Sequence, residues 1–210
     1  MHVLGTVLVL AWPWLVHAAD APALVREGNG RGAPACQSCH GADGGGQPAA
    51  GFPRLAGLAA GYLEKQLTDY AAGTREHPVM QPIARALGAT ERTAVATYYS
   101  RLPVPPPPSG PVPADDGVGA TLATRGRWSQ RVPACEQCHG PGGIGVGANF
   151  PPLAGQPAAY LEAQLQAWQQ GRRRNDPLQL MQHLSRALSA QDVSAVAHWF
   201  AAQRPQGNTP

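Results

Sequence analysis

Apolar side chains recur at intervals of three and four residues in four stretches of the chain, and this spacing predicts four amphipathic helices. The stripes are Leu63, Leu67 and Tyr70; Leu161, Leu165 and Trp168; Val95, Tyr98, Tyr99 and Leu102; and Val193, Val196, Ala197 and Phe200. Gly73 and Gly171 follow the first two stripes, where a helix C-cap belongs. Ser189 and Asp192 have the capping-box spacing that starts the last helix. We therefore expect an all-α fold.

The four stretches form two pairs, because the sequence repeats itself. Three blocks of the first half recur in the second half, at offsets that drift between 98 and 101 residues. The matching blocks are Phe52–Gly57 with Phe150–Gly155, Tyr62–Leu67 with Tyr160–Leu165, and Arg85–Leu87 with Arg186–Leu188. Two copies of one module explain this better than a shared local preference does.

A proline-rich stretch separates the two copies. Seven of the eleven residues from 103 to 113 are proline, which cannot continue a helix and favours an extended, fairly stiff connector. A recognition peptide is the alternative use of such a stretch, but its position midway between the repeats favours a spacer. We expect an N-terminal domain over 20–102, a linker over 103–114 and a C-terminal domain over 115–210.

Residues 1–19 have the features of a secretory signal peptide. The run from Val3 to Val16 is largely apolar, and Val16-His17-Ala18 offers small residues where a signal peptidase cuts. Pro13 interrupts the run, which is too short for a comfortable transmembrane span. We expect cleavage after Ala18 or Ala19 and a periplasmic protein, with an uncleaved anchor as the alternative.

All four cysteines lie in two copies of the pentapeptide Cys-x-x-Cys-His, the attachment signature of a c-type haem. One helical turn presents both thiols to the two vinyl groups, and the next residue supplies an imidazole to the iron. We therefore expect two haem c groups with His40 and His139 as iron ligands. The attaching cysteines are Cys36 and Cys39 in the first copy, and Cys135 and Cys138 in the second.

Other uses of paired cysteines fit less well. A thioredoxin-like dithiol begins a helix after a strand, and no Val/Ile-rich strand precedes either copy. Zinc-binding pairs usually lie closer together than Cys36 and Cys135, which are 99 residues apart. Two local disulfides remain conceivable in an oxidising compartment. None of these uses explains why a histidine follows the second cysteine in both copies.

A second axial ligand is predicted for each iron. After the signal peptide the chain has two methionines, Met80 and Met181, which lie 40 and 42 residues after His40 and His139. One methionine per repeat, at a matching place, favours ligation over the usual role of methionine as an apolar filler. His–Met ligation raises the reduction potential and closes the iron to oxygen or peroxide.

Two histidines near the methionines are alternative ligands. His77 and His183 lie close enough to the methionines to reach an iron if the loop shifted, but they do not match each other in the repeat. His198 lies on the last predicted helix and is expected to pack or to face solvent.

The composition is consistent with this interpretation. Aromatic residues make up 6% of the chain and charged residues 14%, so the polypeptide alone offers a thin core to which two haems would add apolar surface. A formal charge of +3 is too small to indicate nucleic-acid binding. Lys65 is the single lysine, which argues against a polybasic membrane patch; peripheral association with a membrane is left open.

With the haem motifs, the methionines and the repeat together, residues 20–203 resemble the dihaem cytochromes of the cytochrome c4 family. The resemblance implies two tandem class I cytochrome c domains related by approximate twofold symmetry, with the haems facing across the interface. It also implies that the backbone carbonyls of Pro53 and Pro151 fix the ligating imidazoles. The proline-rich linker and the near-absence of lysine depart from the family.

The same resemblance implies an electron carrier rather than an enzyme. Expected partners are a quinol-cytochrome c reductase and a terminal oxidase. The alternative is the cytochrome subunit of a larger dehydrogenase, such as a flavoprotein sulfide dehydrogenase, and a dihaem peroxidase fits less well. If the arginines at 125, 127, 131 and 172–174 gather at the second haem edge, they would form a docking patch for an acidic partner. The alternatives are that they form an ordinary solvated face or that they balance the haem propionates.

Overall fold

The computed structural model describes residues 20–106 and 117–205. Within these segments every regular element is a helix, as the sequence predicts, and the strand-like pairings are isolated bridges. The predicted signal peptide and most of the predicted linker lie outside the described residues. Among the described helices, none has the length and apolar character needed to cross a membrane.

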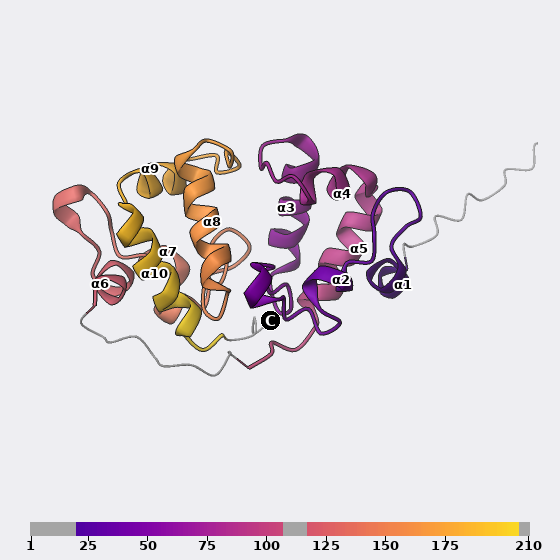
Figure 1. Cartoon of the computed structure of the whole chain (residues 1–210), viewed down its shortest axis with the longest axis horizontal. Coiled ribbons are helices and arrows are strands. Elements are labelled where there is room, and N and C mark those ends of the chain that lie inside the picture. Colours follow the sequence, from indigo (N-terminus) through magenta and orange to yellow (C-terminus); the bar gives the residue numbers. More distant parts are fainter. Residues whose placement is uncertain (1–19, 107–116, 206–210) are drawn as a thin grey trace, which may run out of the picture.

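The N-terminal half, indigo to magenta in Figure 1, consists of helices around one apolar core. Its elements are α1 (Ala21–Glu27), α2 (Gln37–His40), the 3₁₀ turn η1 (Pro48–Ala50), α3 (Ala60–Ala72), α4 (Met80–Ala86) and α5 (Ala89–Ser100). Leu63 of α3 packs with Val95 and Tyr99 of α5, as the stripes predict.

The C-terminal half repeats this order. Its elements are α6 (Val118–Thr124), η2 (Trp128–Gln130), α7 (Glu136–His139), η3 (Pro141–Gly143), α8 (Ala158–Gln169), α9 (Leu180–Arg186) and α10 (Ala190–Ala202). Leu161 of α8 packs with Val196 and Phe200 of α10. The all-α prediction is therefore confirmed, and each half builds its own core.

Two of the three predicted helix ends agree with the structure. Gly73 is the left-handed C-cap of α3, and Ser189 with Asp192 forms the capping box of α10. In α8 the C-cap is Gln170, one residue before the expected Gly171, which has φ 69°.

Glycine at one pair of equivalent positions lets a loop approach a helix closely. A Cβ on Gly44 would lie 2.9 Å from the Tyr99 ring, and one on Gly143 would lie 2.6 Å from the Phe200 ring. Both glycines also have positive φ, so any larger residue would be strained there. The loops after the haem motifs are thereby packed against α5 and α10.

Helices α3 and α8 lie side by side at the centre of the molecule, while α1 and α6 lie at its two outer ends (Figure 1). The loops that follow these two helices are hydrogen-bonded to each other. The Glu76 N–H donates to the Arg172 carbonyl over 2.8 Å, and the Arg174 N–H donates to the Thr74 carbonyl over 2.7 Å. Arg75 and Arg173 form the antiparallel bridge between these contacts. Equivalent residues of the repeat thus meet each other, which is the pattern of an approximately twofold interface.

A second contact ties the halves together at the other end of the interface. The Gln156 side-chain oxygen accepts from the Arg54 N–H over 3.1 Å, and its amide donates to the Arg54 carbonyl over 2.9 Å. The Arg54 guanidinium donates to the Ala154 carbonyl. Arg54 and Gln156 are both buried.

Candidate haem sites

Each Cys-x-x-Cys-His motif folds as one short helix, α2 in the first half and α7 in the second. The first cysteine of each motif precedes the helix, and its Sγ lies against a backbone carbonyl of the preceding helix. That contact joins Cys36 to Leu24 over 3.9 Å and Cys135 to Leu122 over 3.4 Å. The two motifs therefore have the same local structure.

The histidine of each motif is buried and held by a proline carbonyl. His40 Nδ1 lies 3.1 Å from the Pro53 oxygen, and His139 Nδ1 lies 2.8 Å from the Pro151 oxygen. A ring nitrogen that faces a carbonyl carries the proton, so Nε2 keeps a free lone pair for a metal. The prediction that these prolines fix the imidazoles is confirmed.

Burial also sets the charge state of these imidazoles. Desolvation lowers the pKa of His40 and of His139, although the hydrogen bond to each proline carbonyl opposes part of the shift. The charge of Arg173 lowers the pKa of His139 further. Both rings are therefore neutral at pH 7, the form that can bind iron.

The first cysteine of each motif differs from a reactive cysteine, because its pKa is raised and not lowered. Burial raises the pKa of Cys36, and it raises the pKa of Cys135 to about 12. A dithiol redox centre and a zinc site both need thiolates, which form when the pKa is lowered. Across residues 20–106 and 117–205, no three His, Cys, Asp or Glu side chains gather as a metal-binding group. These observations weaken the dithiol and zinc alternatives.

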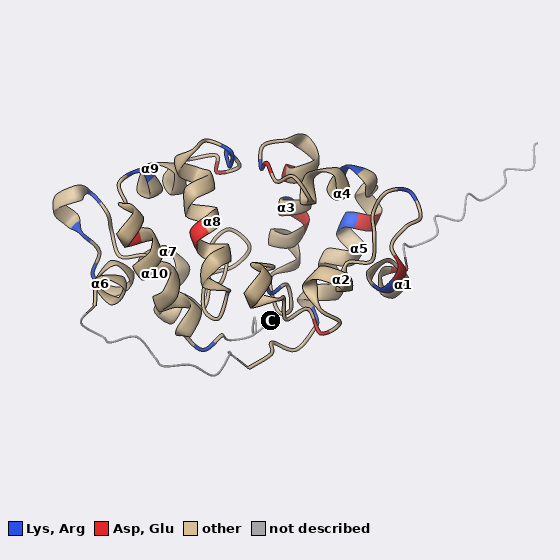
Figure 2. Cartoon of the chain, viewed as in Figure 1, with Lys and Arg blue, Asp and Glu red and all other residues tan. Residues whose placement is uncertain are grey.

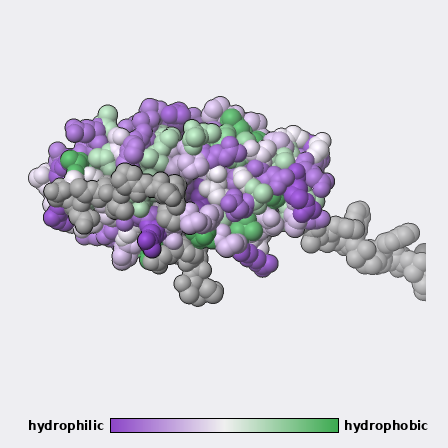
Figure 3. Space-filling view, turned by 60° about the horizontal axis from the view of Figure 1, so that its bottom comes forward, coloured by the Kyte–Doolittle hydropathy of each residue, from purple (hydrophilic) through white to green (hydrophobic). Residues whose placement is uncertain are grey.

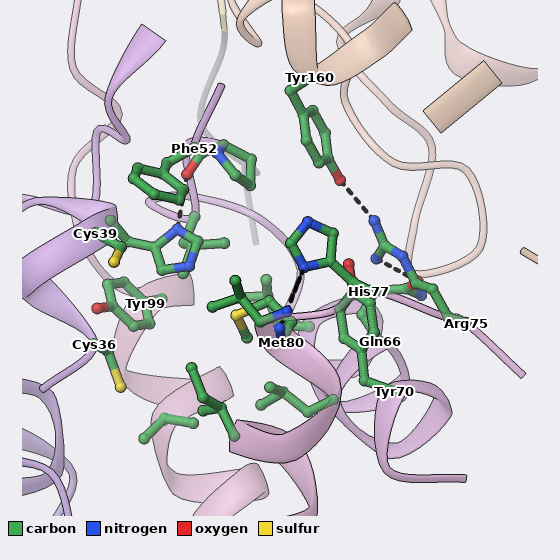
Figure 4. Close-up of a pocket in the computed structure, with 18 of the residues that line it drawn as sticks. Cys36, Cys39, Phe52, Gln66, Tyr70, Arg75, His77, Met80, Tyr99 and Tyr160 are labelled. Atoms are coloured by element: carbon green, nitrogen blue, oxygen red, sulfur yellow. Dashed lines mark hydrogen bonds between the residues drawn. The ribbon is translucent and has the colours of Figure 1, made fainter. Parts of the chain in front are cut away.

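A cavity of about 390 Å³ opens beside the first motif. Its wall is mostly apolar, with side chains of α3, α4 and α5 opposite Cys36 and Cys39. In Figure 4 Met80 lies across the cavity from the two cysteines, with its sulfur on the cavity side. The described structure thus brings the thiols, His40 and Met80 to one hollow.

The methionines occupy equivalent positions at the start of α4 and α9, and each is anchored through its backbone. His77 Nδ1 accepts from the Met80 N–H over 3.2 Å, and Asp176 Oδ2 accepts from the Met181 N–H over 2.6 Å. The structure therefore gives His77 a role in shaping the loop.

The other two histidines considered from the sequence face solvent. His183 and His198 are both exposed.

The cavity wall contains polar atoms that no protein group satisfies. Arg75 Nε and the Tyr99 hydroxyl are buried without a hydrogen-bond partner, and both residues line the cavity. A haem fits this wall, because it is a large apolar ring that carries two carboxylates. The apolar lining suits the ring, and the unpaired Nε of Arg75 suits a carboxylate.

Three of the arginines that the sequence named for a docking patch make contacts within the molecule. Arg173 is buried at the interface between the halves, and Arg174 pairs with Glu76 across it. Arg127 pairs with Asp192. Sequence spacing does not show which loops meet in the folded chain, so these contacts were not predicted.

The sequence model of the cytochrome c family matches residues 31–102 and 119–203, one stretch in each half. The chain belongs to the cytochrome c family. With a Cys-x-x-Cys-His motif in both domains, it is a dihaem cytochrome c and an electron carrier.

Comparison with individual proteins refines this assignment. The chain is similar to the thiosulfate dehydrogenase electron acceptor of Stutzerimonas stutzeri (strain A1501), with 52% identity over 200 residues, covering 94% of this chain and 93% of the relative. It matches the structure of the thiosulfate dehydrogenase of Marichromatium purpuratum with a TM-score of 0.79 and 46% identity, covering 88% of this chain and 40% of that one. It matches reduced cytochrome c4 from Pseudomonas stutzeri with a TM-score of 0.73 and 33% identity, covering 80% of this chain and 93% of that one. The resemblance to cytochrome c4 is thus confirmed.

No interface role was predicted for Gln66, Gln164 or Arg75, and Arg173 was predicted only as part of a basic run. Gln66 and Gln164 lie inside a repeated block, and a Gly-x-Arg pattern places Arg75 and Arg173 in register. The signal available in the sequence was that each of these polar residues recurs at the equivalent position of the other repeat. Its meaning depends on which helices pack together, and the pattern of a single helix does not show this.

Proposed function

We propose that this dihaem cytochrome accepts electrons from a thiosulfate dehydrogenase in the periplasm and passes them to an oxidising partner. The observation that carries the proposal is the 52% identity to a protein named as that enzyme's electron acceptor, over nearly the whole of both chains. Identity to cytochrome c4 is lower, at 33% for a solved structure of similar extent. The proposal replaces sulfide dehydrogenase with thiosulfate dehydrogenase as the expected catalytic partner.

The residue roles belong to the same proposal. Each haem, when bound, supplies an iron that takes up and releases one electron. Two cysteines would hold the ring, a histidine and a methionine would ligate the iron, and the proline carbonyl would keep the imidazole oriented. For the first haem these residues are Cys36, Cys39, His40 and Met80; for the second they are Cys135, Cys138, His139 and Met181.

Direct reduction tests the proposed donor. The oxidised dihaem protein is mixed with a purified thiosulfate dehydrogenase and thiosulfate, and the ferrous haem absorbance is followed in time. We expect full reduction that requires both the enzyme and thiosulfate. A flavoprotein sulfide dehydrogenase with sulfide serves as the comparison donor. Equal or faster reduction by that comparison donor would contradict the proposal.

A second candidate donor is a quinol-oxidising complex, which the resemblance to cytochrome c4 implies. The supporting observation is that the match covers 93% of the cytochrome c4 chain. The same assay with a quinol-cytochrome c reductase and quinol distinguishes this donor from thiosulfate dehydrogenase. The donor that reduces the dihaem protein faster at equal concentration is the better supported one. The acceptor side is tested by oxidation of the reduced protein with a terminal oxidase.

A further inference from the structure

Two buried arginines meet between the two haem sites. Arg75 of the first domain is 4% exposed and Arg173 of the second is 8% exposed. Each guanidinium stacks on an aromatic ring of its own domain, 4.5 Å from the centroid of Tyr70 and 4.6 Å from that of Trp168. Burying a charge is costly unless an opposite charge compensates it.

The hydrogen bonds of this pair cross between the domains. Arg75 donates to Gln66 of its own domain over 2.8 Å and to Gln164 of the other over 2.6 Å. Arg173 donates to Gln164 over 3.1 Å and to Gln66 over 3.2 Å. Arg75 also donates to the Tyr160 hydroxyl, the bond drawn in Figure 4. These acceptors are all neutral.

The nearby carboxylates are already engaged by other groups. Asp69 pairs with Lys65 and accepts from Asn175, and Glu76 pairs with Arg174. Figure 2 shows charges of both signs on the loops that follow α3 and α8, where the loops face each other. Stacking and amide bonds satisfy most of the donors of Arg75 and Arg173 but leave their charge uncompensated. Arg75 Nε has no acceptor at all.

The arginine pair also belongs to a haem site. Both guanidiniums line the cavity that contains Cys36, His40 and Met80, so Arg173 reaches the site of the other domain. The repeat places Arg173 in the second domain where Arg75 stands in the first. The uncompensated charge therefore faces the cavity in which the first haem would lie.

We propose that Arg75 and Arg173 form one shared anion site that binds carboxylates of both haems and ties the two reduction potentials together. A fixed positive charge favours ferrous over ferric haem, because reduction removes one positive charge from the iron. Since each arginine serves both domains, removing either one lowers both potentials. The inference rests on haem binding and does not depend on which enzyme donates the electrons.

The decisive experiment is a redox titration of the holoprotein with the substitution R75Q, and separately with R173Q. Both midpoint potentials are expected to fall, with the larger fall in the haem of the substituted domain. R75K keeps the charge, so both midpoint potentials are expected to stay close to those of the unaltered protein. Mass spectrometry confirms two attached haems in each variant before titration.

A matched control separates charge from packing. Gln156→Ala removes a buried contact across the same interface without changing any charge, so both potentials should stay near those of the unaltered protein. If R75Q does not load haem, Q66E tests the same idea, because a carboxylate at Gln66 neutralises both guanidiniums and should lower both potentials. A shift confined to one haem, or an equal shift in Q156A, would overturn the proposal.

Discussion

At the scale of single residues, the proposed iron ligation depends on two sulfur atoms. Replacing Met80 or Met181 by alanine removes the thioether sulfur from one iron. A thioether ligand favours ferrous iron. Each variant should lose about half of the ferric sulfur-to-iron charge-transfer absorbance, since one of two sites is changed. The midpoint potential of that haem should fall. Absorption and magnetic circular dichroism spectra of the ferric protein make the measurement.

The second domain provides the internal control for each substitution. M80A should leave the haem of the second domain unchanged, and M181A should leave that of the first domain unchanged. Spectra that keep their full charge-transfer intensity in both variants would show that neither methionine is a ligand.

The anchors of the methionines make a second prediction at this scale. Alanine at His77 or Asp176 removes the acceptor of the backbone N–H of Met80 or Met181. Loss of such a cap costs about 1 kcal/mol, which corresponds to a roughly fivefold larger population of the opened loop. Imidazole should therefore bind the ferric haem of that domain roughly fivefold faster, as followed by stopped-flow absorbance.

The two anchor substitutions serve as controls for each other. H77A should leave ligand binding at the second haem unchanged, and D176A should leave the first unchanged. Equal acceleration at both haems would indicate general loosening of the molecule and would count against a local anchor.

At the scale of elements, one buried carboxylate stabilises the start of α10. Asp192 accepts two hydrogen bonds from the Arg127 guanidinium and also caps the helix with Ser189. The hydrogen bond from Arg127, opposed by desolvation, lowers the pKa of Asp192 to about 2. A carboxylate whose pKa is lower in the folded state stabilises the fold above its unfolded pKa of about 3.9.

This carboxylate predicts a pH dependence of stability. The contribution of about 2 kcal/mol is present at neutral pH and is lost as the pH falls from about 4 toward 2. D192N should lower the thermal midpoint of the second domain at pH 7, and the gap from the unaltered protein should close in acid. Thermal unfolding between pH 2 and 7 measures both effects.

The equivalent residue of the first domain is the matched control. Glu91 caps α5 and pairs with Arg31, whose side chain is 68% exposed. Solvent screens this pair, so E91Q should cost less than D192N. A larger effect of E91Q, or a D192N gap that persists at pH 2, would contradict the assignment.

The helices that the sequence predicted are those with one apolar face. Helices α3, α5, α8 and α10 were recognised because their stripes pack against a single core. Helix α6 was missed because it has only seven residues, and its outward positions Val118, Thr121 and Thr124 contrast little in polarity with its buried glycine and alanines. Helix α1 has only seven residues and is similarly hard to detect.

At the scale of the whole molecule, spacing predicted the haem sites but not the contact between the domains. Each haem site is built largely from one short segment that holds two cysteines, a histidine and a proline carbonyl. A local sequence pattern is therefore enough to predict how these groups are arranged. Arg173 is different, because it looks like part of an exposed basic run until its loop meets the loop of Arg75. Long-range pairing is the part of the fold that the sequence pattern left open.

The surface contains one group of exposed charges suited to docking. Figure 3 shows mainly polar side chains on the face drawn, with apolar residues in small separate groups. Arg125 and Arg131 are exposed just before the second haem motif, beside Trp128, which is 64% exposed. No carboxylate of the described residues pairs with Arg125 or Arg131. Exposed arginine and tryptophan are the residue types that contribute most to protein interfaces.

The double substitution R125Q/R131Q should therefore slow reduction by the donor enzyme at low salt by roughly threefold to tenfold, because electrostatic steering is lost. It should also flatten the dependence of the rate on ionic strength, while both reduction potentials stay unchanged. Arg31 precedes the first haem motif as Arg131 precedes the second, and it pairs with Glu91. R31Q is thus the matched control and should leave the rate near that of the unaltered protein. An unchanged salt dependence in R125Q/R131Q, or an equal loss in R31Q, would place the docking surface elsewhere on the molecule.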